Sequence, residues 1–182
     1  MTTLPRDQTA LVIIDVQNDV VATAYQRTER VAAMAQAVDR ARSAGIPVIW
    51  VQHSDPWLEI GSDGWQVVPE LEPWDGEHRV RKTFRSSFVE TDFEEVLSKL
   101  NVGHLYVAGA ETNNCVRHTS HSALERGYDV TLLTDAHTTS NFDWDDGTVD
   151  AAVIINEMNA NFHEYQLPGR AARAVSVSEL AW

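Results

Sequence analysis

The only cysteine of the 182-residue chain, Cys115, lies where an apolar run gives way to a helical pattern. The run 105–110 (LYVAGA) is typical of a short buried strand, and 114–126 (NCVRHTSHSALER) is typical of the helix that follows it. At a helix N-terminus, the dipole and the free backbone N–H groups lower a thiol pKa and can hold a developing oxyanion. We therefore expect a reactive thiol here, although a lone cysteine is often an inert buried side chain.

Two charged side chains fall at the ends of other predicted strands. Asp15 closes the β-branched run 9–16 (TALVIIDV), and Lys82 lies in 79–83 (RVRKT). The carboxyl ends of parallel strands meet at one edge of a sheet, where ligands bind. A carboxylate there can accept the thiol proton, and an ammonium group stabilises the thiolate. Singly, each residue also fits a structural role, Asp15 as a loop cap and Lys82 as a solvated charge.

Strands that alternate with helices must position these residues, and they predict an α/β fold with a parallel sheet covered on both faces. Strands are predicted at 9–16, 47–51, 79–83, 105–110, 129–134 and 172–177, and helices at 30–44, 93–100, 114–126 and 146–162. The segment 54–77, rich in Pro, Gly and Trp, predicts a long ordered loop. With no interdomain linker in the pattern, we expect a single domain over residues 1–182.

The composition restricts the classes of partner. The formal net charge is −13, from 27 acidic and 14 basic residues, which argues against nucleic-acid binding through a broad basic surface. The N-terminal sequence MTTLPRDQT lacks the features of a signal peptide, and no apolar run approaches the ~20 residues that cross a bilayer. We expect a soluble cytoplasmic protein with no nucleic-acid or membrane partner.

Three motifs together resemble the cysteine hydrolases of the isochorismatase-like superfamily. They are LVIIDVQNDV, RKTFRSSFVETDFEEVL and VAGAETNNCVRHTSHSALERGYDVTLLTDAHTT, and they occur in family order over roughly residues 9 to 163. The resemblance implies a three-layer α/β/α, Rossmann-like fold with a six-stranded parallel sheet, the isochorismatase-like hydrolase fold. It also implies a catalytic triad, which here falls on Asp15, Lys82 and Cys115.

The same resemblance implies further features of the reaction. It places an oxyanion hole at the backbone N–H groups of Glu111 and Cys115, and a non-proline cis peptide between Ala110 and Glu111. Attack of the thiol on an amide carbonyl would give a thioester, which water then hydrolyses. The resemblance further suggests a homo-oligomer, either a dimer or a tetramer, that acts on a small-molecule substrate.

The segment after the second strand departs from the metal-binding members of the superfamily. Nicotinamidases carry an Asp-x-His pair and a further His there, whereas this chain has VQHSDPWL, with His53 and Asp55 in those positions. No second histidine follows within the loop, and two groups do not complete a metal site. We expect no metal and no other cofactor, with His53 a polar pocket residue or a loop anchor.

The leading hypothesis is a metal-independent cysteine amidohydrolase that cleaves a C–N bond of a small amide or lactam. For the aromatic candidates in the pocket wall, core packing is as good an interpretation as substrate contact. The candidate wall residues are Val20, His53, Trp57, Trp65, Phe88 and Asn114. The alternatives are a nicotinamidase-type metal-assisted amidase, an isochorismatase-type vinyl ether hydrolase, and a non-catalytic member that binds a metabolite or a partner.

Overall fold

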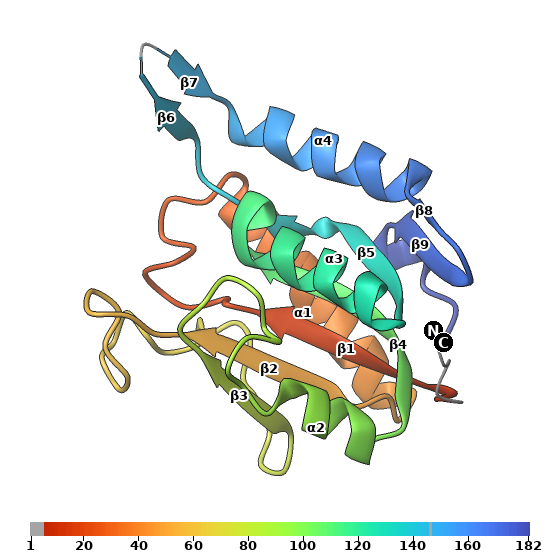
Figure 1. Cartoon of the computed structure of the whole chain (residues 1–182). Helices are drawn as coiled ribbons and strands as arrows, with labels where there is room; N and C mark the ends of the chain where they lie inside the picture. Colours follow the sequence, from red (N-terminus) through yellow and green to blue (C-terminus); the bar gives the residue numbers. More distant parts are fainter. Residues whose placement is uncertain (1–5, 146) are drawn as a thin grey trace.

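The computed structural model describes residues 6–145 and 147–182, and its centre is a twisted sheet with the order β3-β2-β1-β4-β5-β9-β8 (Figure 1). All neighbours are parallel except β8, which pairs antiparallel with β9. The strands are β1 Gln8–Ile14, β2 Val48–His53, β3 His78–Lys82, β4 Val102–Ala110, β5 Asp129–Thr138, β8 Gln166–Leu167 and β9 Arg170–Val175. The expected six parallel strands are confirmed, and β8 adds a short seventh.

Helices cover both faces of this sheet, which confirms the three-layer arrangement. Alternate residues of β1 point to opposite faces, Val12 toward one cluster and Leu11 toward the other. The first cluster includes side chains of α2, α3 and α4, and the second includes those of α1 and of the C-terminal 3-10 turn. The helices are α1 Arg27–Ser43, α2 Phe93–Lys99, α3 Arg117–Arg126 and α4 Ala151–Glu164, and the turn is Val177–Glu179. Because β1 is buried on both faces, its sequence is a nearly continuous apolar run.

Glycines end two helices where the sequence predicts. Gly45 follows α1 with φ 70°, and the Ile46 N–H donates to the Ala41 carbonyl over 2.8 Å. Gly127 follows α3 with φ 97°. Both adopt the left-handed backbone that glycine tolerates best, so the chain leaves the helix and enters the next strand.

A hairpin between β5 and α4 differs from the expectation. Strands β6 (Phe142–Trp144) and β7 (Gly147–Val149) pair antiparallel, and α4 begins only at Ala151. The expected helix start, Asp146, lies outside the described residues, but the helix predicted over 147–150 is wrong. Aromatic and β-branched side chains in this segment favour strand pairing, and Figure 1 shows the hairpin projecting from the body.

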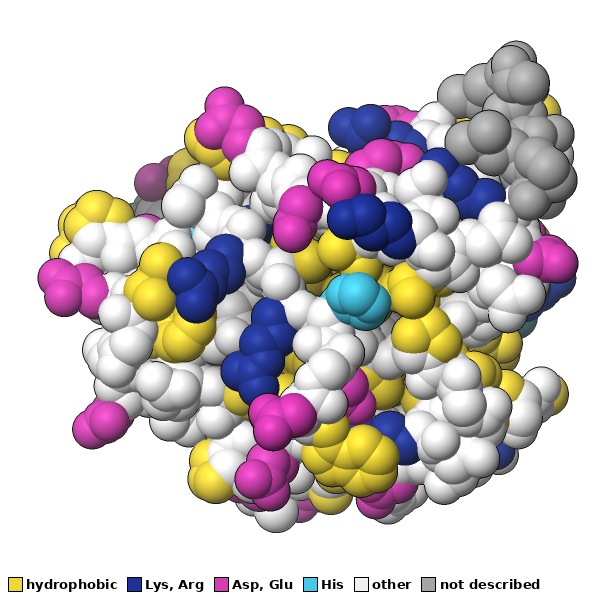
Figure 2. All heavy atoms as spheres, turned by 90° about the horizontal axis from the view of Figure 1, so that it is seen from below, with side chains coloured by type: hydrophobic (Ala, Val, Ile, Leu, Met, Phe, Trp, Pro, Cys, Tyr) yellow, Lys and Arg dark blue, Asp and Glu magenta, His cyan; other side chains and the backbone are white. Residues whose placement is uncertain are grey.

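The surface seen from below carries mixed charge. Figure 2 shows acidic and basic side chains interspersed with polar and hydrophobic ones on this face. Within the described parts of the chain, no helix combines the length and the apolar character needed to cross a membrane.

The chain adds strands in opposite directions on either side of the β1–β4 pair, which makes this pair the topological switch point of the sheet. Gly109 lies there, near the end of β4. Gly109 pairs with Ile14 in register and has φ 123°. A Cβ at this position would lie 2.1 Å from the Ile14 carbonyl oxygen and 2.6 Å from its nitrogen. The absence of a side chain therefore lets the ends of β1 and β4 approach each other, directly before Asp15 and before the segment that carries Cys115.

We expect Gly109→Ala to lower the free energy of unfolding by about 3 kcal/mol, because the new methyl group meets main-chain atoms that cannot rotate away. Urea denaturation followed by circular dichroism measures this. Gly147→Ala is the matched control, since apart from the neighbours of Gly147 in the chain no atom of the described residues lies within 4 Å of a Cβ built there. Equal stability of the two variants would contradict this account of the switch point.

Candidate active site

Asp15, Lys82 and Cys115 meet at the carboxyl edge of the sheet. Asp15 follows β1, Lys82 ends β3, and Cys115 lies between β4 and α3. The Lys82 Nζ is 2.5 Å from the Asp15 Oδ2 and donates a hydrogen bond to the Cys115 Sγ over 3.1 Å. Asp15 is 1 % exposed and Lys82 is 2 % exposed. A buried carboxylate, a buried ammonium group and a partly buried thiol thus form one cluster.

The main chain fixes the position of the carboxylate. Asp15 has φ 51°, a left-handed conformation that aspartate tolerates better than most residues, and its N–H donates to the Val51 carbonyl over 2.9 Å. Its Oδ1 is buried and accepts no hydrogen bond from the described residues. One carboxylate oxygen therefore faces the ammonium group, and the other is available to accept a proton.

Cys115 lies in a π-helical turn, Thr112–Val116, where the sequence predicts the first turn of an α-helix. The peptide between Ala110 and Glu111 that precedes the turn is cis, as the resemblance implies. Side chains hold the turn in place. The Asn114 Nδ2 donates to the Glu111 Oε2 over 2.7 Å, and the Thr139 Oγ1 donates to the Asn113 Oδ1 over 2.8 Å. The π-turn thereby sets the direction of the Cys115 side chain before α3 begins at Arg117.

Burial raises the pKa of the Cys115 thiol to about 12, and the charge of Asp15 raises it further, while Lys82 lowers it. The expectation of a lowered pKa is wrong for the free protein. A helix N-terminus contributes only about 0.3–1 kcal/mol, whereas burial of a charged group shifts a pKa by up to several units. The resting thiol is therefore protonated.

The charges of the other two groups depend on each other. Burial raises the pKa of Asp15, against the lowering effect of the nearby Lys82 ammonium. Burial lowers the pKa of Lys82, but the charge of Asp15, together with that of Cys115 once its thiolate forms, outweighs it, so the pKa of Lys82 is raised. The cluster thus holds a cationic Lys82 and one proton that the thiol and the carboxylate exchange. This arrangement suits transfer of the thiol proton to Asp15 during attack on a substrate.

A cavity of about 490 Å³ is lined by Asp15 and Cys115, with Lys82 behind them in contact with both. Of the wall residues expected from the sequence, Val20, His53 and Asn114 line it. The complete lining is Asp15, Asp19, Val20, Thr23, His53, Asp55, Arg85, Glu111, Asn114, Cys115 and Ser140. The volume fits a small molecule.

Three aromatic residues expected in the wall lie elsewhere, which corrects that expectation. Trp57 is 89 % exposed on the long loop, and Trp65 is buried, with its carbonyl accepting a hydrogen bond from the Gln17 side chain. Phe88 packs against Phe93, with the ring centroids 4.8 Å apart. Aromatic residue type alone does not distinguish a pocket wall from core packing, so sequence alone cannot separate the two for these residues.

Four further residues line the cavity that are not among those expected from the sequence: Asp19, Thr23, Arg85 and Ser140. Asp19 follows Asp15 by four residues, Arg85 follows Lys82 by three, and Ser140 follows the end of β5. Polar residues just beyond the carboxyl ends of parallel strands were therefore the available signal.

His53 and Asp55 form a loop anchor. The His53 Nε2 lies 3.3 Å from the Asp55 Oδ2, and the Asp55 Oδ1 accepts the N–H groups of Trp57 and Leu58, each over 2.8 Å. These backbone hydrogen bonds, the one from Trp57 first, lower the pKa of Asp55. The Gln17 Oε1 accepts the His53 N–H over 2.8 Å. Over the described ranges, no group of three or more His, Cys, Asp or Glu residues has an arrangement that would hold a metal ion.

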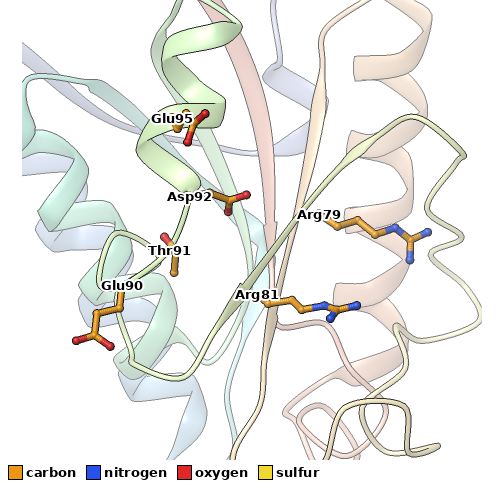
Figure 3. A pocket seen from close by; sticks show the side chains of 6 residues that line it. All are labelled: Arg79, Arg81, Glu90, Thr91, Asp92 and Glu95. Carbon is orange, nitrogen blue, oxygen red and sulfur yellow. The ribbon is translucent and has the colours of Figure 1, made fainter.

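A larger cavity, about 750 Å³, lies beside the edge strand β3 (Figure 3). Its lining residues are Arg79, Arg81, Glu90, Thr91, Asp92 and Glu95. In Figure 3, the two arginine side chains point away from Asp92 and Glu95. None of the lining side chains is a thiol or an imidazole, and the Thr91 hydroxyl donates its proton to the Ser87 carbonyl, so this cavity offers charge but no activated nucleophile.

His137 connects the π-turn to α4. Its Nδ1 lies 2.8 Å from the Thr112 Oγ1, and its Nε2 lies 2.8 Å from the Asn159 Oδ1. An amide oxygen only accepts, so the Nε2 carries the proton and the Thr112 hydroxyl donates to the Nδ1. Burial lowers the pKa of His137 to about 4. The imidazole is therefore neutral and acts as a fixed bridge behind the nucleophile.

Comparison with known proteins assigns the chain to a family. The isochorismatase domain family matches residues 9–161. The chain therefore belongs to the isochorismatase family of hydrolases. The fold agrees, since an isochorismatase from Pseudomonas putida KT2440 superimposes with a TM-score of 0.85 at 28 % identity, covering 98 % of this chain and 94 % of that one.

Individual relatives differ in what is known of them. A streptothricin hydrolase of Streptomyces noursei is 34 % identical over 140 residues, covering 71 % of this chain. The matched region is 49 % of that relative, so this chain spans about half its length. The isochorismatase family protein YrdC of Bacillus subtilis, which is uncharacterized, is 28 % identical and is matched over 89 % of its length. A probable inactive nicotinamidase of Arabidopsis thaliana is 29 % identical over 155 residues.

The thiol pKa predicts the rate at which iodoacetamide alkylates Cys115, which intact mass reports without ambiguity. Near neutral pH, the thiolate fraction is about 3,000-fold lower than that of an ordinary thiol with pKa near 8.5, and the greater nucleophilicity of the more basic thiolate recovers about 30-fold. We therefore expect labelling about 100-fold slower, rising steeply in alkali. Asp15→Asn removes a charge that opposes the thiolate, so labelling becomes faster. Lys82→Met removes a charge that favours it, so labelling becomes slower.

Circular dichroism of both variants controls for unfolding. Fast labelling of the wild-type protein at neutral pH, or the same direction of change in both variants, would contradict this account of the site.

His137 predicts a loss of stability in acid. Its pKa in the folded protein is below the unfolded value, so between about pH 6.5 and about pH 4 the unfolded chain binds more protons, and stability falls as the pH falls. From about pH 7.5 to about pH 5, this one group costs about 2 kcal/mol. His137→Gln lacks that contribution, so its urea stability changes less between the two pH values. Parallel pH dependences of wild type and variant would show that His137 does not stay neutral.

Proposed function

We propose that this chain is a metal-independent cysteine amidohydrolase that cleaves the C–N bond of a small amide or lactam. The observation that carries the proposal is the buried cluster in which Lys82 contacts both Asp15 and Cys115 at the floor of a cavity of about 490 Å³. A thiol, a base and a fixed positive charge together meet the requirements of nucleophilic catalysis at a carbonyl group.

Acylation begins from the resting state, in which the Cys115 thiol is protonated, Lys82 is cationic and Asp15 is a carboxylate. As the Cys115 Sγ attacks the carbonyl carbon, its proton passes to Asp15, which has a carboxylate oxygen without a hydrogen-bond partner among the described residues. Lys82 stabilises the developing thiolate from 3.1 Å. Asp15 then returns the proton to the leaving nitrogen, the C–N bond breaks, and a thioester remains on the sulfur.

The carbonyl oxygen becomes an oxyanion in this step and requires donors. The backbone N–H groups of Glu111 and Cys115 are the proposed donors, because both belong to the segment that carries the nucleophile and both residues line the cavity. Deacylation reverses the roles. Asp15 takes a proton from water, the water oxygen attacks the thioester carbonyl, and the Cys115 thiol is regenerated as the carboxylic acid leaves.

The comparisons support hydrolysis of a small molecule without identifying it. The name of the Streptomyces relative indicates hydrolysis of streptothricin, but this chain matches only about half of that protein. The residues that line the cavity of this chain therefore determine which substrates it accepts.

Triad variants test the proposal. We expect Cys115→Ala, Asp15→Asn and Lys82→Met each to lower amide hydrolysis by about 10³-fold or more, since the three groups act as a unit. Ammonia or amine release from a panel of small amides and lactams is the assay. Acid-quenched wild-type enzyme should gain the mass of one acyl group, and Cys115→Ala should gain none.

Full amide hydrolysis by Cys115→Ala would reject a thioester route. Cleavage of a vinyl ether by wild type that Cys115→Ala retains would point to thiol-independent vinyl ether hydrolysis. Substrate-sized ligands that bind without any turnover would point to a non-catalytic member, the condition indicated by the description of the Arabidopsis relative. A stoichiometric zinc ion in protein purified without added metal would favour the alternative of a metal-assisted amidase.

A further inference from the structure

We propose that the cavity around Cys115 selects substrates that carry a positive charge, an ammonium or guanidinium group, close to the scissile bond. That such a substrate is hydrolysed at a C–N bond rests on the proposed amidohydrolase function. The charge selectivity is a property of the cavity itself, so the two are tested separately.

The lining of the cavity has an excess of negative charge. Lys82 and Asp15 carry opposite charges in direct contact and cancel each other. Outside this pair, the charged lining residues are three carboxylates and one guanidinium group: Asp19, Asp55, Glu111 and Arg85. His53, the remaining titratable group of the lining, is paired with Asp55. The balance therefore attracts cations and repels anions.

Two of the three carboxylates have capacity left for a ligand. Asp55 is engaged by two backbone N–H groups and by His53. Glu111 accepts one hydrogen bond, from the Asn114 side chain to its Oε2, which leaves its other oxygen. For the Asp19 carboxylate, the described residues provide no hydrogen bond or ion pair. Glu111 also belongs to the segment that carries Cys115, so a cation bound there lies beside the reacting carbonyl.

The position of Asp19 is built into the fold. Its N–H donates to the Gly64 carbonyl over 3.1 Å, and the neighbouring Asn18 donates through its Nδ2 to the Asp63 carbonyl over 2.7 Å. A Cβ at residue 64 would lie 2.0 Å from the Asp19 Oδ2. The carboxylate therefore occupies space that only glycine leaves open, and the long loop holds it at the cavity.

An independent observation indicates a ligand that donates hydrogen bonds in the same cavity. Asp15 lines it and is 1 % exposed, and its carboxylate contacts the Lys82 ammonium group and the Cys115 thiol. The two oxygens of a carboxylate can accept more donors than these two groups provide, and an incoming N–H group supplies one. A cationic amine or amide substrate brings such donors.

Charged thiol reagents measure the selectivity without requiring turnover. Cys115 is the single thiol, and methanethiosulfonates convert its thiolate to a mixed disulfide with release of methanesulfinate. We compare the cationic trimethylammonioethyl reagent with the anionic sulfonatoethyl reagent, and divide their rate ratio by that for N-acetylcysteinamide. Both reagents react with the same thiolate, so the raised thiol pKa cancels from the ratio.

At low ionic strength, we expect a normalised preference for the cation of about tenfold, which decreases as salt is added. Asp19→Asn should lower the preference about threefold, and Asp19→Lys should abolish it. Asp39→Asn is the matched control, because it removes the same charge from an exposed position on α1 outside this cavity. A ratio near one, a preference for the anion, or equal effects of Asp19→Asn and Asp39→Asn would overturn the proposal.

Hydrolysis of three matched amides separates this proposal from the amidase proposal. They are γ-aminobutyramide, valeramide and glutaramate, which share a chain length and differ in terminal charge. Cation-selective labelling with faster hydrolysis of γ-aminobutyramide supports both proposals. Cation-selective labelling of a protein that hydrolyses no amide retains the charge selectivity and removes the amidase. Hydrolysis that favours valeramide or glutaramate removes the charge selectivity and retains the amidase.

Discussion

The buried ion pair between Lys82 and Asp15 is the constraint on which the site depends. Removal of one partner of such a pair leaves an uncompensated buried charge, which typically costs about 3–5 kcal/mol. The two residues come from strands that are not neighbours, since β2 lies between β1 and β3. Their contact is therefore possible only when all three strands end in register, with Ile14 beside Val51 and His53 beside Lys82. Fold and site thus share one geometric requirement.

The layers of the fold were predictable because they follow from burial on both faces. A parallel strand covered by helices reads as a continuous apolar run, and glycine after a helix marks its end, as at Gly45 and Gly127. The hairpin β6–β7 and the short strand β8 were not predictable in this way. Their pairing is local and largely exposed, so no apolar pattern distinguishes them from loop or helix.

The site was predictable in its residues but not in its electrostatics. The motifs placed Asp15, Lys82 and Cys115, and the structure brings their side chains together. The thiol pKa was expected to fall and instead rises to about 12, because chain position reveals the helix start but not the depth of burial. The prediction of aromatic residues in the pocket wall is wrong for a related reason. Trp57 and Phe88 share a residue class, yet one is exposed and the other packs in the core.

Burial raises the thiol pKa and the charge of Asp15 adds to it, and Asp15 lines the same cavity as the carboxylates of Asp19 and Glu111. Negative charge near the sulfur disfavours a free thiolate, so the resting protein keeps a neutral and weakly reactive thiol. A substrate cation held by Asp19 or Glu111 adds positive charge to the same space. This addition stabilises negative charge on the sulfur at the moment when Asp15 accepts the proton. In this scheme, the group that identifies the substrate also lowers the free energy of forming the nucleophile, and selectivity and activation are one interaction.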